Sequence, residues 1–114
     1  MHKGSCHCGA VAFEVETDLE QVIECNCSIC RKKGYQLTFV PRSKLNVIRG
    51  EDNLATYTFN THTVQHRFCA TCGCAPFGEG KKPTREATAA VNIRCLDDIE
   101  LSDIKTIPFN GWDA

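Results

Sequence analysis

Apolar and polar side chains alternate along several short stretches of the chain. Val11, Phe13 and Val15 alternate with alanine and glutamate across residues 10–16, which is the pattern of a strand with one buried face. Similar patterns predict further strands at residues 20–25, 36–40, 44–49, 54–59, 63–68 and 87–93. The pattern therefore predicts a series of short strands.

Turn and helix signals complete this outline. Residues 78–83 contain two glycines, two lysines and a proline, so we expect a loop there. No stretch keeps a helical period for long. Helix is predicted only as a turn after Cys27 and as a short segment near residues 96–104. With no repeat, low-complexity tract or linker, we expect one mainly antiparallel β domain with little helix over residues 1–114.

Composition excludes some partners. The 114 residues carry a formal net charge of -1 and an ordinary apolar share of 42%, so neither nucleic acid nor a membrane surface is indicated as a partner. Residues 1–5 run into the first cysteines without an apolar stretch. We therefore expect neither a signal peptide nor a membrane segment, and a location in the reducing cytoplasm.

The nine cysteines carry the most specific signal. A disulfide framework would normally use an even number of thiols, and cysteines two or three residues apart bond poorly to each other but converge easily on one metal ion. Zinc is the metal that suits such thiolate groups. We expect metal to brace a small core and its removal to unfold the chain. Seven cysteines form three tight clusters, Cys6-x-Cys8, Cys25-x-Cys27-x-x-Cys30 and Cys69-x-x-Cys72.

The first and last of these clusters suggest one closed zinc site. Cys69 and Cys72 are followed by Gly73, and this spacing is typical of a zinc knuckle, with glycine where the backbone bends around the sulfurs. Cys6 and Cys8 repeat the arrangement at shorter spacing before Gly9. The economical assignment joins Cys6, Cys8, Cys69 and Cys72 in one tetrahedral, structural site.

Three cysteines remain for a second site. Cys25, Cys27 and Cys30 are one ligand short of the four that structural zinc prefers, and an exchangeable fourth position is how catalytic zinc is built. Water, an outside thiol or a carbonyl oxygen could take that position. Spacing leaves open the alternative that a fourth protein ligand closes the site. The candidates for that ligand are Cys74, Cys95, His62 and His66.

The basic run Arg31, Lys32 and Lys33 follows Cys30 directly. Its ordinary interpretation is a solvated turn. Beside an anionic zinc site, the same cations would offset charge and bind carboxylates.

Three segments together resemble the glutathione-dependent formaldehyde-activating enzyme family, which also includes centromere protein V. This resemblance implies a β-tent fold, with structural zinc at Cys6, Cys8, Cys69 and Cys72 and open zinc at Cys25, Cys27 and Cys30. The segments are Gly4-Ser5-Cys6-His7-Cys8-Gly9-Ala10-Val11, Cys25-Asn26-Cys27-Ser28-Ile29-Cys30-Arg31-Lys32 and Phe68-Cys69-Ala70-Thr71-Cys72-Gly73.

The family's activity would make this protein a carbon-sulfur lyase that joins the glutathione thiol to formaldehyde or a small aldehyde. Cys25, Cys27 and Cys30 would then hold the catalytic zinc, and Arg31, Lys32 and Lys33 would bind the glutathione carboxylates. The alternative is a non-catalytic binding module in which both zinc sites are structural. The sequence specifies no oligomeric state, so monomer and dimer both remain open.

Overall fold

The computed structural model describes residues 1–59, 64–81 and 86–110. Strands make up 46% and helices 18% of the structure, which confirms the mainly β prediction. One α-helix, α1 (Ser28–Lys33), and four short 3-10 turns complete the described part. The strands are β1 (His2–Ser5), β2 (Ala12–Val15), β3 (Val22–Cys25), β4 (Leu37–Pro41), β5 (Leu45–Arg49), β6 (Leu54–Tyr57), β7 (Gln65–Cys69), β8 (Phe77–Lys81), β9 (Ala87–Asn92) and β10 (Thr106–Phe109).

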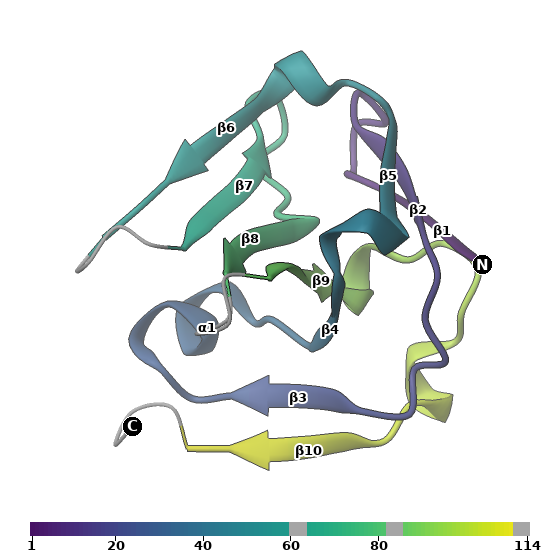
Figure 1. Ribbon diagram of the computed structural model, residues 1–114, viewed down its shortest axis with the longest axis vertical. Coiled ribbons are helices and arrows are strands. Elements are labelled where there is room, and N and C mark those ends of the chain that lie inside the picture. The colour runs from purple at the N-terminus through teal and green to yellow at the C-terminus, as the bar shows by residue number, and fades with distance from the viewer. Residues whose placement is uncertain (60–63, 82–85, 111–114) are drawn as a thin grey trace.

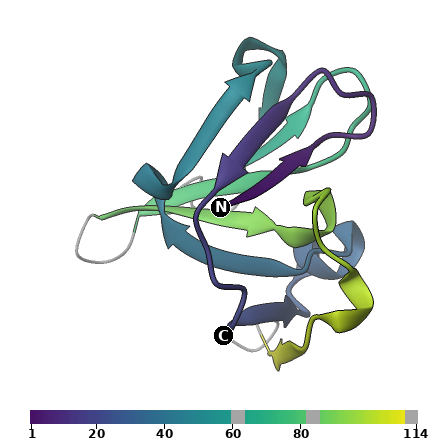
Figure 2. The same ribbon diagram turned by 90° about the vertical axis from the view of Figure 1, so that its right-hand side faces the viewer.

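The strands form two sheets. A small sheet has the order β1-β2-β5, and a long sheet has the order β10-β3-β4-β9-β8-β7-β6. All pairings are antiparallel except that of β10 with β3, which is parallel. The long sheet curves strongly from β6 to β10 (Figure 1), and Figure 2 shows the small sheet leaning over it. No helix in the described ranges is long and apolar enough to cross a bilayer.

The main core lies between these sheets. Phe13 of the small sheet meets Phe77 of the long sheet edge to face, with ring centroids 6.3 Å apart, a geometry that aromatic quadrupoles favour. Both side chains are fully buried, as are Val15, Val91 and Ile93 around them. Burial of these apolar side chains is the principal force holding the two sheets together.

The predicted strands agree with the structure to within a few residues, but some predictions are wrong. Residues 78–81 belong to strand β8, which pairs on both sides with β7 and β9, so tertiary pairing overrides the local glycine signal. The segment near 96–104 contains only the 3-10 turn Leu101–Asp103 and no α-helix. Strands β1 and β10 were not predicted. Residue 63, the first of the predicted strand at 63–68, lies outside the described residues.

Candidate metal centres

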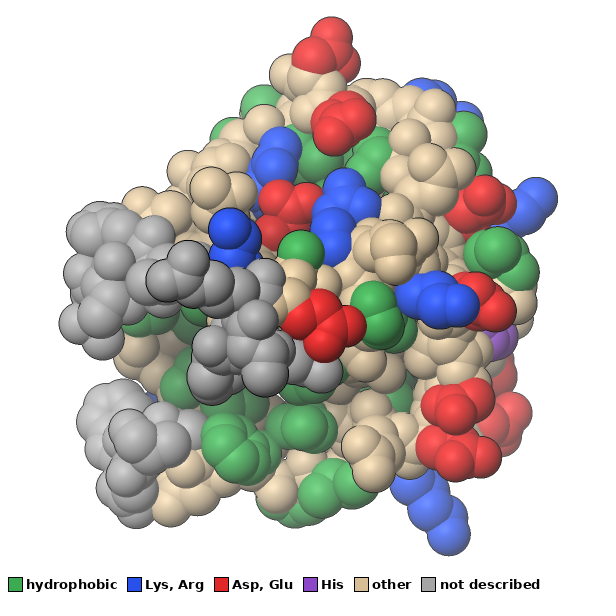
Figure 3. Space-filling view, in the orientation of Figure 1, with side chains coloured by type: hydrophobic (Ala, Val, Ile, Leu, Met, Phe, Trp, Pro, Cys, Tyr) green, Lys and Arg blue, Asp and Glu red, His purple; other side chains and the backbone are tan. Residues whose placement is uncertain are grey.

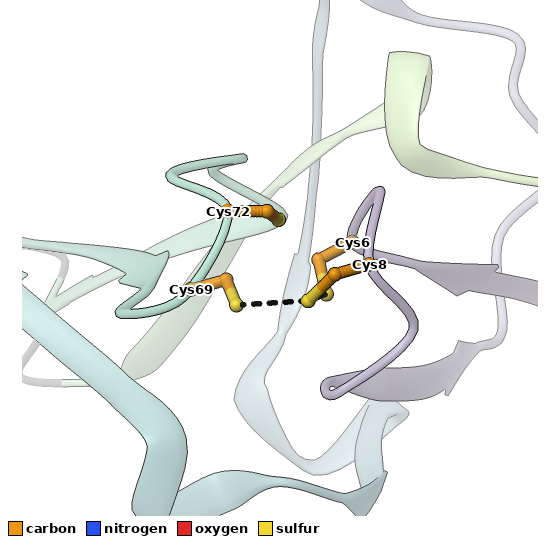
Figure 4. A group of neighbouring side chains, drawn as sticks. All are labelled: Cys6, Cys8, Cys69 and Cys72. Atoms are coloured by element: carbon orange, nitrogen blue, oxygen red, sulfur yellow. Dashed lines mark hydrogen bonds between the residues drawn. The ribbon is translucent and has the colours of Figure 1, made fainter.

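Four cysteine side chains converge from two distant turns. Cys6 and Cys8 lie between β1 and β2, while Cys69 ends β7 and Cys72 lies in the turn that follows. Their sulfur atoms all lie within 4.8 Å of one another, and Figure 4 shows the two pairs facing each other across a common centre. This four-cysteine cluster brings together the same residues that the spacing assigns to one site.

The distances within the four-cysteine cluster fit a tetrahedral ion. Four sulfurs at the usual zinc–sulfur distance of about 2.3 Å would stand about 3.8 Å from one another. The Sγ atoms of Cys6 and Cys8 are 3.6 Å apart, and those of Cys8 and Cys69 are 3.7 Å apart. A disulfide requires about 2.0 Å, and all nine cysteines are free thiols. The cluster can therefore hold one metal ion without rearrangement.

The backbone around the four-cysteine cluster favours the binding of a metal ion. Gly9 and Gly73 each follow a cysteine pair, and both have a φ of 82°, a left-handed conformation that glycine adopts without strain. Further donors reach the sulfurs, since the Val11 N–H donates to Cys6 Sγ at 3.3 Å and Asn53 Nδ2 donates to Cys69 Sγ at 3.4 Å. These donors orient the sulfurs and favour their anionic form.

Cys72 shows the same preference for the anion. The backbone N–H groups of Cys74 and Cys8 lower the pKa of Cys72 to about 5. A thiol with this pKa is ionised at neutral pH, and the thiolate is the form that binds metal.

The three-cysteine cluster, Cys25, Cys27 and Cys30, is local. Cys25 ends β3, Cys27 precedes α1 and Cys30 lies within α1, so one tight turn brings the sulfurs within 4.8 Å of one another. The Cys27 N–H donates to Cys25 Sγ at 3.4 Å. Cys30 is 7% exposed, whereas Cys25 and Cys27 are half-buried. Two of the three cysteines in this cluster are therefore only partly buried.

The charge state of Cys27 is set by two opposing effects. Burial raises its pKa, but hydrogen bonds from the backbone N–H of Cys30, from the Cys30 and Cys25 thiols and from the backbone N–H of Ile29 more than compensate, so the pKa lies below its ordinary value. The sulfur of this half-buried residue therefore favours the form that binds metal.

No fourth ligand atom joins the three-cysteine cluster from the described ranges of the chain. Cys74 packs against the four-cysteine cluster instead. Cys95 Sγ lies 3.7 Å from the Ala75 carbonyl oxygen, and burial raises the pKa of Cys95 to about 12, which keeps its thiol protonated. His66 stacks on Phe59 with ring centroids 5.4 Å apart. His62, the remaining candidate, lies outside the described residues.

Cations flank the three-cysteine cluster. Arg31, Lys32 and Lys33 occupy the last turn of α1, and all three side chains are exposed. Lys33 Nζ lies 5.2 Å from the centre of the Phe68 ring, and Phe68 packs against the apolar cluster that contains Cys30. The basic run is therefore next to the three-cysteine cluster in space as well as in sequence.

The model of the glutathione-dependent formaldehyde-activating enzyme family matches residues 1–108. The chain belongs to this family. The matched range contains both cysteine clusters, strands β1 to β9 and most of β10.

This formaldehyde-activating enzyme family member is similar to two further proteins. The crystal structure of a Rhodobacter sphaeroides protein is 36% identical in sequence and superposes with a TM-score of 0.82, covering 93% of this chain and 97% of that chain. A Halomonas elongata protein, provisionally named a glutathione-dependent formaldehyde-activating enzyme, is 33% identical over 82 residues, or 64% of this chain and 52% of that protein. The chain thus matches about half the length of this curated relative.

Sequence reasoning missed two residues beside the clusters of this family member. The contact of Phe68 with Lys33 could not be predicted, because a cation over an aromatic ring leaves no periodic signal. Asn92 is 7% exposed, and its Nδ2 donates to the Ala75 carbonyl at 3.0 Å. An asparagine at the end of an apolar strand is the one signal in the sequence that would have identified this bond, because buried amides need partners.

Proposed function

We propose that this protein joins a small thiol, glutathione, to formaldehyde or a small aldehyde at the three-cysteine cluster. The observation that carries this proposal is the geometry of Cys25, Cys27 and Cys30, whose sulfurs gather on one turn beside three exposed cations. Family membership supports the same reaction. The product would be a carbon-sulfur adduct, which makes the protein a lyase of the carbon-sulfur class.

The four-cysteine cluster is the less suitable place for this chemistry. Cys8 is exposed and Cys72 is half-buried, so burial does not separate the two clusters, but four thiols would fill a tetrahedral coordination shell and leave no position for a substrate. We assign a structural metal ion to that cluster and the reacting centre to the three-cysteine cluster.

Zinc is the ion that we propose at both clusters. Sulfur-only donor sets select zinc over the harder divalent cations. At the three-cysteine cluster, bound zinc would supply a fourth position that favours a thiolate or polarises a carbonyl oxygen. Because these cysteines must remain reduced, the proposed location is the cytoplasm.

The cations of α1 would bind and orient the thiol substrate. Three thiolates and a divalent ion give a net charge of about -1, which would repel the carboxylates of glutathione. Arg31, Lys32 and Lys33 offset this charge, and the forked guanidinium of Arg31 matches a carboxylate in shape. Lys33 lies over the Phe68 ring, so that part of the cationic surface is fixed next to the cysteines.

The proposed reaction needs no oxidant. The thiol sulfur forms a bond to the aldehyde carbon, the carbon–oxygen double bond becomes single, and the proton of the thiol ends on the oxygen. Tyr35 packs in the same buried apolar cluster as Cys30. Burial raises the pKa of Tyr35 to about 12, so its phenol stays protonated throughout.

Calorimetric titration of reduced glutathione into the zinc-loaded protein tests the proposal. We expect binding to the native protein and to Cys74→Ser, which changes a cysteine outside both clusters, and no binding to a folded Cys27→Ser variant. The native protein and Cys74→Ser should form the adduct from formaldehyde faster than the spontaneous reaction, whereas Cys27→Ser should not. A protein that holds two zinc ions but binds no glutathione would favour the non-catalytic binding module instead.

A further inference from the structure

An open groove lies on the long sheet near the three-cysteine cluster. Its volume is about 730 Å³, which is within the usual range for small-molecule sites. Phe39 and Val64 line it although they are 51% and 43% exposed, and such exposure of large apolar side chains often indicates a binding surface. Small residues complete the lining, notably Gly78, Gly80, Ala87 and Ala90.

The groove and the three-cysteine cluster share one face of the sheet. Ala90 lines the groove and also packs against the apolar cluster that contains Cys30. In and just before β7, Phe68 packs against the apolar cluster that contains Cys30, and Val64 lines the groove. Four residues of extended chain separate these two contacts, or roughly 13 Å. A ligand in the groove can therefore extend toward the cysteines.

Glycine in β8 forms the floor of this groove. Gly78 pairs with Ala90 on one side and His66 on the other, so these residues form one row across three strands. Glycine inside a strand weakens it and often marks a place where a ligand approaches the backbone. A Cβ atom at Gly80 would lie 3.7 Å from Val64 Cγ2, which is ordinary contact, so packing does not require glycine here.

The charged residues of the groove largely compensate one another. Glu79 accepts hydrogen bonds from Arg42 Nε at 2.7 Å and from Arg67 Nη1 at 3.2 Å. Figure 3 shows acidic and basic side chains close together above the centre of this face, hydrophobic side chains in its lower middle, and further acidic side chains at its lower right. Apart from Lys81, an exposed cation at the end of β8, the groove therefore offers mainly apolar contacts.

We propose that this groove is the subsite for the carbonyl substrate and that it accepts an aldehyde with an apolar alkyl chain. This inference rests on the proposed function. Glutathione is anionic and suits the cations of α1, which leaves the apolar groove for the second substrate. Formaldehyde has no substituent and would leave the groove unfilled. The alkyl chain lies over Gly78 and Gly80, and the aldehyde carbon points toward the cysteines.

Chain length in the aldehyde tests this assignment. Zinc-loaded protein is assayed with glutathione and formaldehyde, butanal or hexanal, and the spontaneous rate is subtracted. We expect kcat/KM to be about tenfold higher for hexanal than for butanal, because burial of each added CH₂ gives up to about fourfold. Gly80→Val places a branched side chain on the groove floor and should bring this ratio close to one.

A matched variant and a binding measurement complete the design. Thr56→Val introduces the same side chain at an exposed position of β6. Thr56 pairs with Arg67, and the next pair along the strands is Tyr57 with His66. Thr56 therefore lies on the opposite face of the sheet from His66 and the groove. The hexanal/butanal ratio should be retained in this variant. The unreactive 1-hexanol should shift the NMR amide signals of Ala87 and Ala90 in the native protein and not in Gly80→Val, with melting curves confirming that each variant is folded.

The outcomes separate this inference from the proposed function. Adduct formation with formaldehyde but no preference for hexanal, or a preference unchanged in Gly80→Val, would overturn the subsite and leave the proposed reaction intact. Absence of catalysis with every aldehyde would overturn both.

Discussion

The two cysteine clusters use the same ligand atom in opposite ways. The four-cysteine cluster joins turns 61 residues apart, between Cys8 and Cys69, and buries Cys6 and Cys69. The three-cysteine cluster lies within residues 25–30 of one turn and keeps Cys25 and Cys27 half-buried. The first arrangement links distant parts of the chain with four thiols, and the second is local and has three.

Chain entropy makes this difference quantitative. A cross-link that closes a loop of about 60 residues removes roughly 4 kcal/mol of entropy from the unfolded state, whereas one that closes about six residues removes roughly 2 kcal/mol. Metal–ligand bonds add to both values, but only the four-cysteine cluster connects the small sheet to the long one. On this estimate, a metal ion at the four-cysteine cluster would stabilise the fold more than one at the three-cysteine cluster.

The largest effect should follow the loss of Cys69. Cys69→Ser removes a fully buried ligand and with it a metal contribution on the order of 10 kcal/mol, comparable to the whole stability of a small domain. We expect a chain that is largely unfolded at 25 °C by circular dichroism. Cys74→Ser should remain folded with two metal ions by elemental analysis. A Cys69→Ser variant that melts like the native protein would show that this cluster does not support the fold.

The loss of Cys27 should have a smaller effect on stability and a complete effect on catalysis. Cys27→Ser removes one ligand of a local turn, so we expect one metal ion instead of two and a loss of about 2 kcal/mol in the free energy of unfolding. Urea titration and metal analysis of the same sample measure both quantities. If Cys27→Ser unfolded as completely as Cys69→Ser, the contrast between a site that supports the fold and a local three-cysteine site would be lost.

The sequence predicted both clusters because cysteine spacing is a local signal. Zinc knuckles need cysteines two or three residues apart, and the structure brings these residues together in the same two groups. Strands with one buried face, such as β2 and β5, could also be predicted, because their apolar and polar residues alternate.

What the sequence could not show depends on long-range pairing. Strand β10 pairs with β3 about 80 residues earlier, and Pro108 within it argues locally against a strand. Strand β8 was taken for a loop because Gly78 and Gly80 are turn residues by local rules. The same two glycines line the groove. The residues that made the strand prediction wrong are therefore also those that leave space for the proposed subsite.

Asn92 binds the segment of Ala75 and Pro76, which follows the turn of the four-cysteine cluster. Its Nδ2 donates to the Ala75 carbonyl, and its backbone N–H donates to the Pro76 carbonyl at 2.9 Å. Asn92→Ala leaves a buried carbonyl without its partner and should cost about 2 kcal/mol, measured by urea unfolding, with both metal ions retained. The exposed Asn46→Ala should change stability by less than about 0.5 kcal/mol. Loss of either metal ion in Asn92→Ala would mean that the two sites are coupled through this segment.

The smallest effect concerns the cations that distinguish the three-cysteine cluster from the four-cysteine cluster. Burial and the nearby Lys33 ammonium lower the pKa of His66. Lys33→Gln should raise this pKa, as followed by the imidazole proton signals in an NMR titration, whereas Lys44→Gln, which changes a surface pair with Glu16, should not.

The same shift has a consequence for stability. The folded chain resists protonation of His66 more than the unfolded chain does, so the free energy of unfolding should fall as the pH decreases through about 6.5. This decrease should be smaller in Lys33→Gln, because the folded-state pKa then lies closer to the unfolded value. An unchanged pKa of His66 in Lys33→Gln would mean that the α1 cations do not act on the sheet face that carries the groove, and the proposed binding of glutathione and aldehyde side by side would lose its electrostatic basis.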